Sequence, residues 1–153
     1  MGRVVVFGLF VFLCFSSVYA GANYQDLAND YYRFQKAKQT PVDPCTPRTS
    51  CFKTACDLID RFECDDMSEQ ENIRNACRGV WGGECVTVAS QLLGRFEFDD
   101  NEEMVQLVTS CRGVYDLECV RYSCGRLGRM GCDDLEEVLQ VNRSCASAHP
   151  YYN

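Results

Sequence analysis

Cysteines are the side chains of this sequence most able to do chemistry, because there are 12 of them among 153 residues but only one histidine, His149. In an exported chain this density indicates disulfide bonds. Zinc is the alternative, but no Cys-x-x-Cys pair occurs and His149 is the only imidazole available as a ligand. We therefore expect structural disulfides, with no metal site and no cofactor.

The cysteine positions repeat with a period of 34 residues. Cys51, Cys85 and Cys119 form one series, and Cys77, Cys111 and Cys145 form another. Other residues keep the same register, including the pairs Asp65-Asp66, Asp99-Asp100 and Asp133-Asp134. Since these matches need no gap, the sequence predicts three tandem units at 51–84, 85–118 and 119–152.

The middle unit lacks two cysteines at once. Ser90 and Phe98 stand where the outer units have Cys56 and Cys64, or Cys124 and Cys132. Loss of both is what a bonded pair predicts, so we expect the bonds Cys56–Cys64 and Cys124–Cys132. Eight residues of continuous helix would separate the partners by about 12 Å, so each bond also requires a chain reversal between them.

Two regular schemes remain for the other cysteines. The first ties the ends of each unit, as Cys51–Cys77, Cys85–Cys111 and Cys119–Cys145, and leaves Cys45 free or paired with another chain. The second links successive units, as Cys45–Cys51, Cys77–Cys85 and Cys111–Cys119, and leaves Cys145. We favour the first because each unit is then self-contained and its longer loops gain about 3.5 rather than about 2.5 kcal/mol each in the chain-entropy model.

Each unit has the pattern of two helices. The first helix is predicted to run for about nine residues from the leading cysteine and to end at Asp60, Gly94 or Gly128. The second is predicted to begin after the Asp pair, where Asp66 and Glu69 have capping-box spacing, and to end at Gly79 or Gly113. The sequence therefore predicts an all-α fold, a short right-handed solenoid of three disulfide-stapled two-helix repeats.

The architecture is similar to that of known helical repeats. The 34-residue two-helix period resembles that of tetratricopeptide repeats, and the stapled helix pairs resemble Sel1-type cysteine-rich secreted proteins. The tetratricopeptide Trp, Leu-Gly, Tyr and Pro positions are absent, so the resemblance carries over no functional residue.

The N-terminal 50 residues divide into three segments. Residues 1–20 have a basic start, an apolar run and small residues before Ala20, which is typical of a cleaved signal peptide and too short for a membrane span. Residues 23–38 carry aromatic and aliphatic side chains at helical spacing, and residues 39–50 form a linker with three prolines. We expect the helix to cover the exposed end of the first repeat, with docking on a partner as the alternative.

The charge of the chain excludes several classes of partner. Lys and Arg number 15 and Asp and Glu 22; because residues 1–20 hold one base and no acid, the mature chain has a net charge of −8. Such a surface repels nucleic acid and anionic lipid. We expect a protein that is secreted, or periplasmic or on the cell surface if the source is bacterial.

Several residues are candidates for binding. Arg61, Arg95 and Arg129 recur with the repeat, and they either cap helix carbonyls, which we favour, or form an exposed ladder for an acidic ligand. Trp81 and Tyr115 share one loop position in successive units. Asn142-Arg143-Ser144 is a glycosylation acceptor in a eukaryotic cell, although its predicted helical setting disfavours use.

The sequence offers no catalytic constellation. No serine or cysteine is placed to form a catalytic triad with His149. The Asp pairs are explained by helix capping rather than by calcium binding or acid–base catalysis. We therefore expect a protein that is not an enzyme and that binds another protein. The predicted signal peptide contains Cys14, so 11 cysteines remain in the mature chain. A disulfide-linked dimer through the odd cysteine, Cys45 in the favoured scheme, is a further prediction. The alternatives are a structural or stress-resistant envelope component and a secreted toxin or inhibitor.

Overall fold

The computed structural model describes residues 23–35, 49–59, 63–93, 100–128 and 131–148. All regular elements in these ranges are helical, as the sequence predicts. They are seven α-helices and one π-helical turn: α1 (Tyr24–Asp30), η1 (Tyr31–Gln35), α2 (Cys51–Leu58), α3 (Met67–Ala76), α4 (Glu84–Leu92), α5 (Asn101–Ser110), α6 (Leu117–Leu127) and α7 (Leu135–Ser147). The predicted signal peptide at 1–20 lies outside the described residues.

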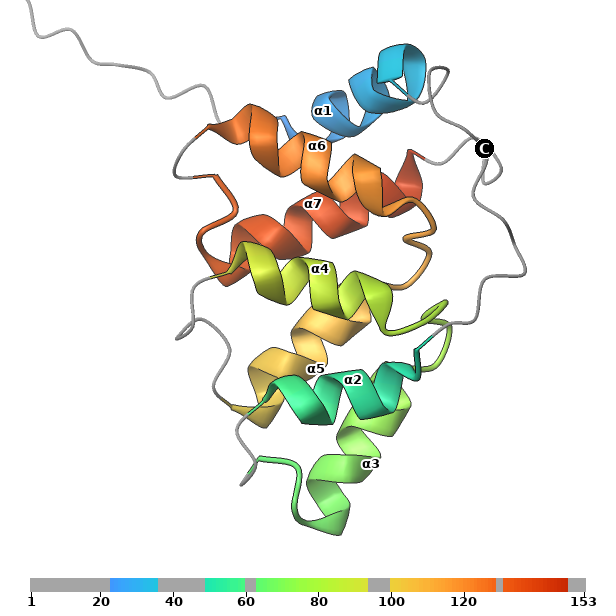
Figure 1. Cartoon of the computed structure of the whole chain (residues 1–153), viewed down its shortest axis with the longest axis vertical. Coiled ribbons are helices and arrows are strands. Elements are labelled where there is room, and N and C mark those ends of the chain that lie inside the picture. Colours follow the sequence, from blue (N-terminus) through green and yellow to red (C-terminus); the bar gives the residue numbers. More distant parts are fainter. Residues whose placement is uncertain (1–22, 36–48, 60–62, 94–99, 129–130, 149–153) are drawn as a thin grey trace, which may run out of the picture.

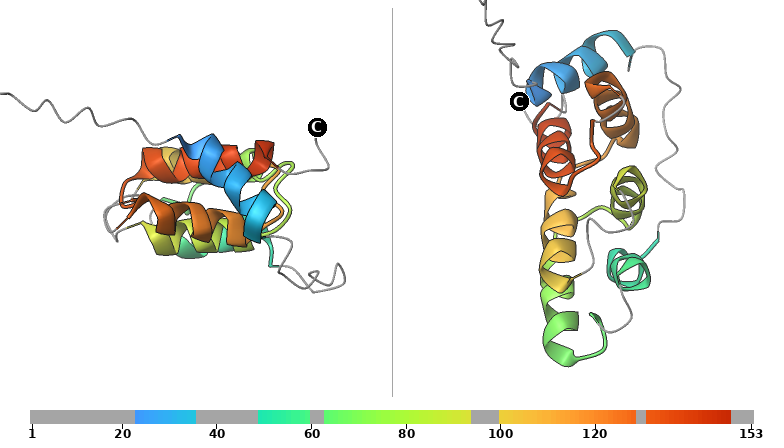
Figure 2. Two further views of the ribbon diagram at one scale, coloured as in Figure 1. Left: turned by 90° about the horizontal axis from the view of Figure 1, so that it is seen from above. Right: turned by 90° about the vertical axis from the view of Figure 1, so that its left-hand side faces the viewer.

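The helices from 51 onward form two rows, seen side by side in Figure 2. Helices α2, α4 and α6 pack against one another in one row, and α3, α5 and α7 pack in the other. Each helix of the first row also contacts the next helix in the chain, so that α2–α3, α4–α5 and α6–α7 are three successive pairs (Figure 1).

Aspartates begin the helices of the second row, as their spacing predicts. The side chain of Asp66 accepts from the backbone N–H of Glu69, and the Glu69 carboxylate accepts from that of Asp66, which completes a capping box. Asp100 and Asp134 each accept from the backbone N–H three residues on. The chain then leaves α3 and α5 through Gly79 and Gly113, whose φ angles of 82° and 78° favour glycine.

Five disulfides hold the three helix pairs. Three of them join the start of the first helix to the end of the second: Cys51–Cys77, Cys85–Cys111 and Cys119–Cys145. The other two are Cys56–Cys64 and Cys124–Cys132. These are the pairs of the first scheme, and their Cα atoms are 5.4 to 5.9 Å apart. The second scheme is not formed, and Cys45 lies outside the described residues.

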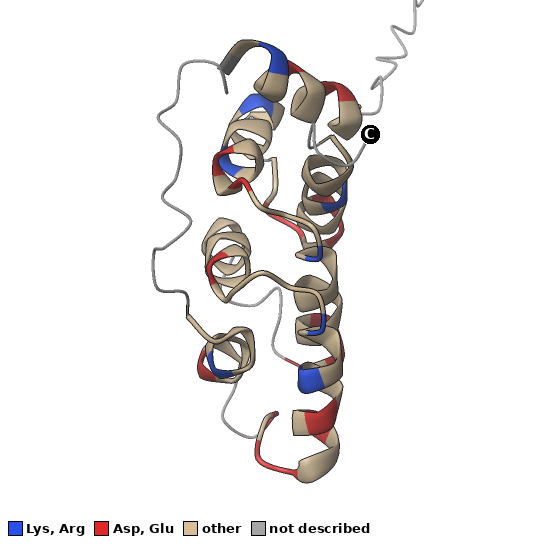
Figure 3. Ribbon diagram, turned by 90° about the vertical axis from the view of Figure 1, so that its right-hand side faces the viewer, with Lys and Arg blue, Asp and Glu red and all other residues tan. Residues whose placement is uncertain are grey.

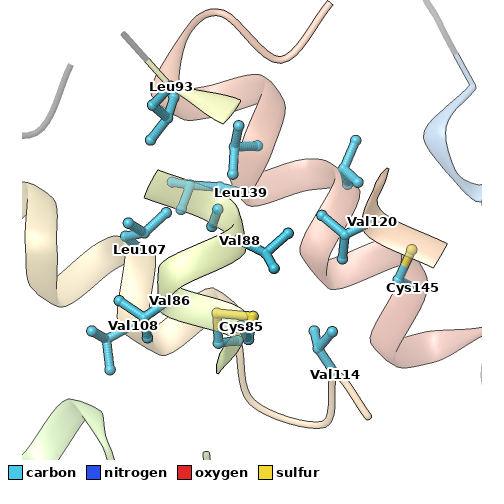
Figure 4. Packing of buried hydrophobic residues seen from close by; sticks show 14 of the residues in the cluster. Cys85, Val86, Val88, Leu93, Leu107, Val108, Val114, Val120, Leu139 and Cys145 are labelled. Carbon is cyan, nitrogen blue, oxygen red and sulfur yellow. A yellow bond between two sulfur atoms is a disulfide. The ribbon is translucent and has the colours of Figure 1, made fainter. Parts of the chain in front are cut away.

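The core lies between the two rows and runs through all three pairs. Figure 4 shows Val86 and Val88 of α4 packed with Leu107 and Val108 of α5, beside the disulfide of Cys85. Leu107 and Val108 are fully buried. Because side chains of neighbouring pairs share this core, each pair stabilises the next.

The N-terminal helix covers the opposite end of the array from the one predicted. Helices α1 and η1 pack on α7 and α6, the last pair, so the expectation that this segment covers the first repeat is wrong (Figures 1 and 2). The Tyr31 side chain is 1% exposed, and its hydroxyl donates to Oδ1 of the buried Asp116 at 2.9 Å. Its ring also packs on that of Tyr122, with centroids 5.7 Å apart.

The outer face of α3, in the first helix pair, carries polar side chains instead. Gln70 of α3 occupies the position of the buried Met104 and Val138 in the later units. Arg74 occupies the position of the buried Val108 and Asn142. The Arg74 guanidinium donates to Gln70 at 3.1 Å and lies 4.6 Å from the ring centre of Phe52. A cation over the ring face shields this aromatic side chain, and the two polar residues make this face of α3 hydrophilic.

Candidate functional site

The predicted aromatic pair is brought together by the fold. Trp81 lies in the α3–α4 loop and Tyr115 in the α5–α6 loop, and their rings meet edge to face with centroids 5.3 Å apart. The Trp81 side chain is 51% exposed, whereas Tyr115 is half-buried. A large aromatic surface is therefore held in place by its neighbour at the loop edge of the array.

The predicted arginine ladder cannot be placed. Arg61, Arg95 and Arg129 all lie outside the described residues, so both roles proposed for them, carbonyl capping and an exposed ladder, stay predictions. His149, one period after Tyr115, also lies outside them.

A different arginine performs the capping role. Arg112 donates from Nε to the carbonyl oxygen of Ala76 at 3.3 Å, and from Nη2 to the carbonyls of Asn75 at 3.1 Å and Ala76 at 3.2 Å. It thus bonds the last carbonyls of α3, in the preceding pair. The recurrence of Arg78-Gly79-Val80 as Arg112-Gly113-Val114 was the available signal, but sequence alone does not show that the side chain reaches back one unit.

Replacing Arg112 with glutamine is expected to lower the free energy of unfolding by about 1 kcal/mol, because the α3 carbonyls lose a charged donor at an exposed site. Urea denaturation would measure this. The matched control is Arg78→Gln, since Arg78 is exposed and has no preceding unit to cap. Equal losses for the two variants would contradict the capping role.

The face of the second row is hollowed between its helices. One hollow of about 510 Å³ lies between α3 and α5, and another of about 400 Å³ lies between α5 and α7. They adjoin, because Thr109 and Arg112 line both. This face was not foreseen, because the residue types differ at equivalent positions of the three units, such as Asn75, Thr109 and Arg143.

Acidic groups gather at the start of α7, but hydrogen bonds of the fold account for them. Carboxylate oxygens of Asp133, Asp134 and Glu137 lie within 4.8 Å of one another. Asp134 accepts from the N–H of Glu137, and Glu137 accepts from that of Cys132, both at 2.8 Å. Burial raises the pKa of the nearby Tyr24 phenol, and the negative charges of Glu137, Asp134 and Glu136 raise it further.

The glycosylation acceptor is inaccessible in the folded chain. Asn142 is 0% exposed within α7, and its Nδ2 donates to the Ser110 hydroxyl at 2.8 Å. A glycan on this amide would displace α5, so the motif has a packing role here.

Comparisons with protein-family models, with curated proteins and with solved structures found no match for this chain. Among the helices that the structure describes, none combines the length and apolar character needed to cross a membrane.

Proposed function

We propose that the chain is an exported, disulfide-stapled helical repeat protein that binds another protein without catalysing a reaction. The observation that carries the proposal is the half-exposed Trp81, held against Tyr115 at the loop edge. Tryptophan and tyrosine dominate the energetics of protein interfaces, and an aromatic side chain fixed before binding loses less conformational entropy.

The repeat architecture supports this proposal. We interpret the three helix pairs as a short right-handed solenoid of units 51–84, 85–118 and 119–152, because three disulfides with the same sequence separation of 26 close equivalent pairs. Solenoids present continuous surfaces that cross several units, and Trp81 and Tyr115 lie on such a surface. Disulfide pairing of ten cysteines fits the oxidising environment outside the cell.

Site-specific photo-crosslinking tests the proposal. A benzophenone amino acid would replace Trp81 in the exported protein, and crosslinked products would be identified by mass spectrometry. The matched control places the same group at Met67, which is 82% exposed at the start of α3. We expect one protein to be crosslinked from position 81 and not from position 67.

Competition provides the second measurement. Excess wild-type chain should suppress the crosslink from position 81, whereas a Trp81→Ala/Tyr115→Ala chain should not. Equal crosslinking from both positions, or equal competition by both chains, would overturn the proposed binding surface.

A further inference from the structure

The two hollows on the second row together form a groove that crosses three helices. Asn72, Asn75 and Glu102 line its α3–α5 half, whereas Arg143 and Ser147 line its α5–α7 half. Thr109 and Arg112 lie where the halves meet, because both hollows include them. Figure 3 shows the two rows from the side, with the positions of charged residues marked along the second row.

The α5–α7 half of the groove is cationic in an acidic protein. Its lining contains Arg112 and Arg143 and three hydroxyl side chains, but no carboxylate, although Asp and Glu outnumber Lys and Arg in the chain by 22 to 15. Both arginines are exposed. Two neighbouring guanidinium groups are the chemistry that recognises a carboxylate.

The ends of α5 and α7 do not use this positive charge. The last carbonyls of α5 accept from groups of α5 itself and of the turn after it, such as the Ser110 hydroxyl on Leu107 at 2.7 Å and the Cys111 N–H on Val108 at 3.1 Å. The Ser144 carbonyl of α7 accepts from the Ala148 N–H at 2.9 Å. Arg112 bonds α3 through Nε and Nη2, which leaves Nη1 for a ligand.

We propose that this groove binds an extended acidic segment of a protein partner, with its carboxylates at Arg112 and Arg143. The inference deepens the proposed function and rests on it. Three helices spaced about 9 Å apart give a groove of about 20 Å, which matches about six residues of extended chain. A polyanion such as nucleic acid is disfavoured because the net negative charge of the protein repels it, whereas a segment with two carboxylates is not strongly affected.

Titration of the full, oxidised, isotope-labelled chain with a blocked hexapeptide, acetyl-Ala-Glu-Ala-Glu-Ala-Ala-amide, tests the proposal by nuclear magnetic resonance. We expect amide shifts at Thr109, Gly113 and Ala146. The same peptide with glutamine in place of glutamate should produce no such shifts. Shifts that are absent, lie elsewhere on the chain or are equal for the two peptides would overturn the proposal.

Two variants separate the site from general charge effects. Arg143→Gln should weaken binding of the acidic peptide about threefold, as expected for one exposed ion pair, and it should leave the fold intact. Arg126→Gln removes the same charge from α6, outside the groove, and should leave binding unchanged. Equal weakening by both variants would show that the peptide responds only to overall charge, which contradicts a site.

A titration with inorganic sulfate distinguishes a site for an acidic peptide from a site for a small anion. Sulfate that binds at the same residues as tightly as the acidic peptide would overturn the peptide assignment in favour of a small-anion site; weaker binding of sulfate supports it. The crosslinking result at position 81 is independent. A positive crosslink with a negative titration would therefore overturn the groove alone, and the reverse result would overturn the role of Trp81.

Discussion

Replacing both Cys85 and Cys111 with alanine is expected to lower the free energy of unfolding by about 3.5 kcal/mol, which is the chain-entropy value for a loop of 27 residues. The middle pair has no second disulfide, because Ser90 stands where the outer pairs have a bonded cysteine. Among the described residues, Cys85–Cys111 is therefore the only disulfide of this unit, and the helices of both neighbouring units pack against it. Urea denaturation of the double variant would measure the loss.

The matched control is the double variant Cys56→Ala/Cys64→Ala. It removes a disulfide whose cysteines are 8 residues apart, from a first pair that retains Cys51–Cys77. The free energy of unfolding should fall by about 2.5 kcal/mol. The middle variant should also show a broader transition, since the outer pairs can separate when the centre loosens. An equal or smaller loss for the middle variant would refute the view that it is the critical bond.

The helices and the disulfides were predictable because they leave a linear signature. A constant period of 34 residues sets the helix pairs, and the joint absence of cysteine at Ser90 and Phe98 identifies a bonded pair without any structure. Capping residues work over three or four positions, so Asp66 with Glu69 could be recognised locally, and the structure forms that capping box.

Contacts between units were not predictable in the same way. An amphipathic pattern at 23–38 shows that one face is buried but not which surface buries it, so the placement on the first pair was wrong. The decisive groups are Tyr31 and Asp116, 85 residues apart, together with Gln70 and Arg74, which make the first end polar. Arg112 was missed for the same reason, since its acceptors lie 36 and 37 residues earlier.

The position of α1 and η1 has a consequence for stability. Every helix from α2 to α7 belongs to a pair closed by at least one disulfide, whereas no disulfide of the described residues reaches α1 or η1. Their docking depends on noncovalent contacts such as the bond from the Ser147 hydroxyl to Gln25 at 2.8 Å. This segment should therefore open locally before the stapled pairs do.

Replacing Tyr31 with alanine is expected to raise hydrogen exchange of residues 24–35 about 100-fold, because removing a buried aromatic side chain costs about 3 kcal/mol. The change also leaves the carboxylate of Asp116, which is 7% exposed, without the phenol that donates to it. Exchange measured by mass spectrometry would locate the effect, and α2 to α5 should keep their protection. Tyr31→Phe should produce a smaller increase, about tenfold, since it removes only the hydroxyl.

The matched control is Phe34→Ala in the same segment: Phe34 is 61% exposed, so its removal should change exchange little. If Tyr31→Ala and Phe34→Ala had the same effect on exchange, the buried Tyr31 ring would not be what holds α1 and η1 on α6 and α7. The outer surface of η1 would then have to supply the contacts that hold them.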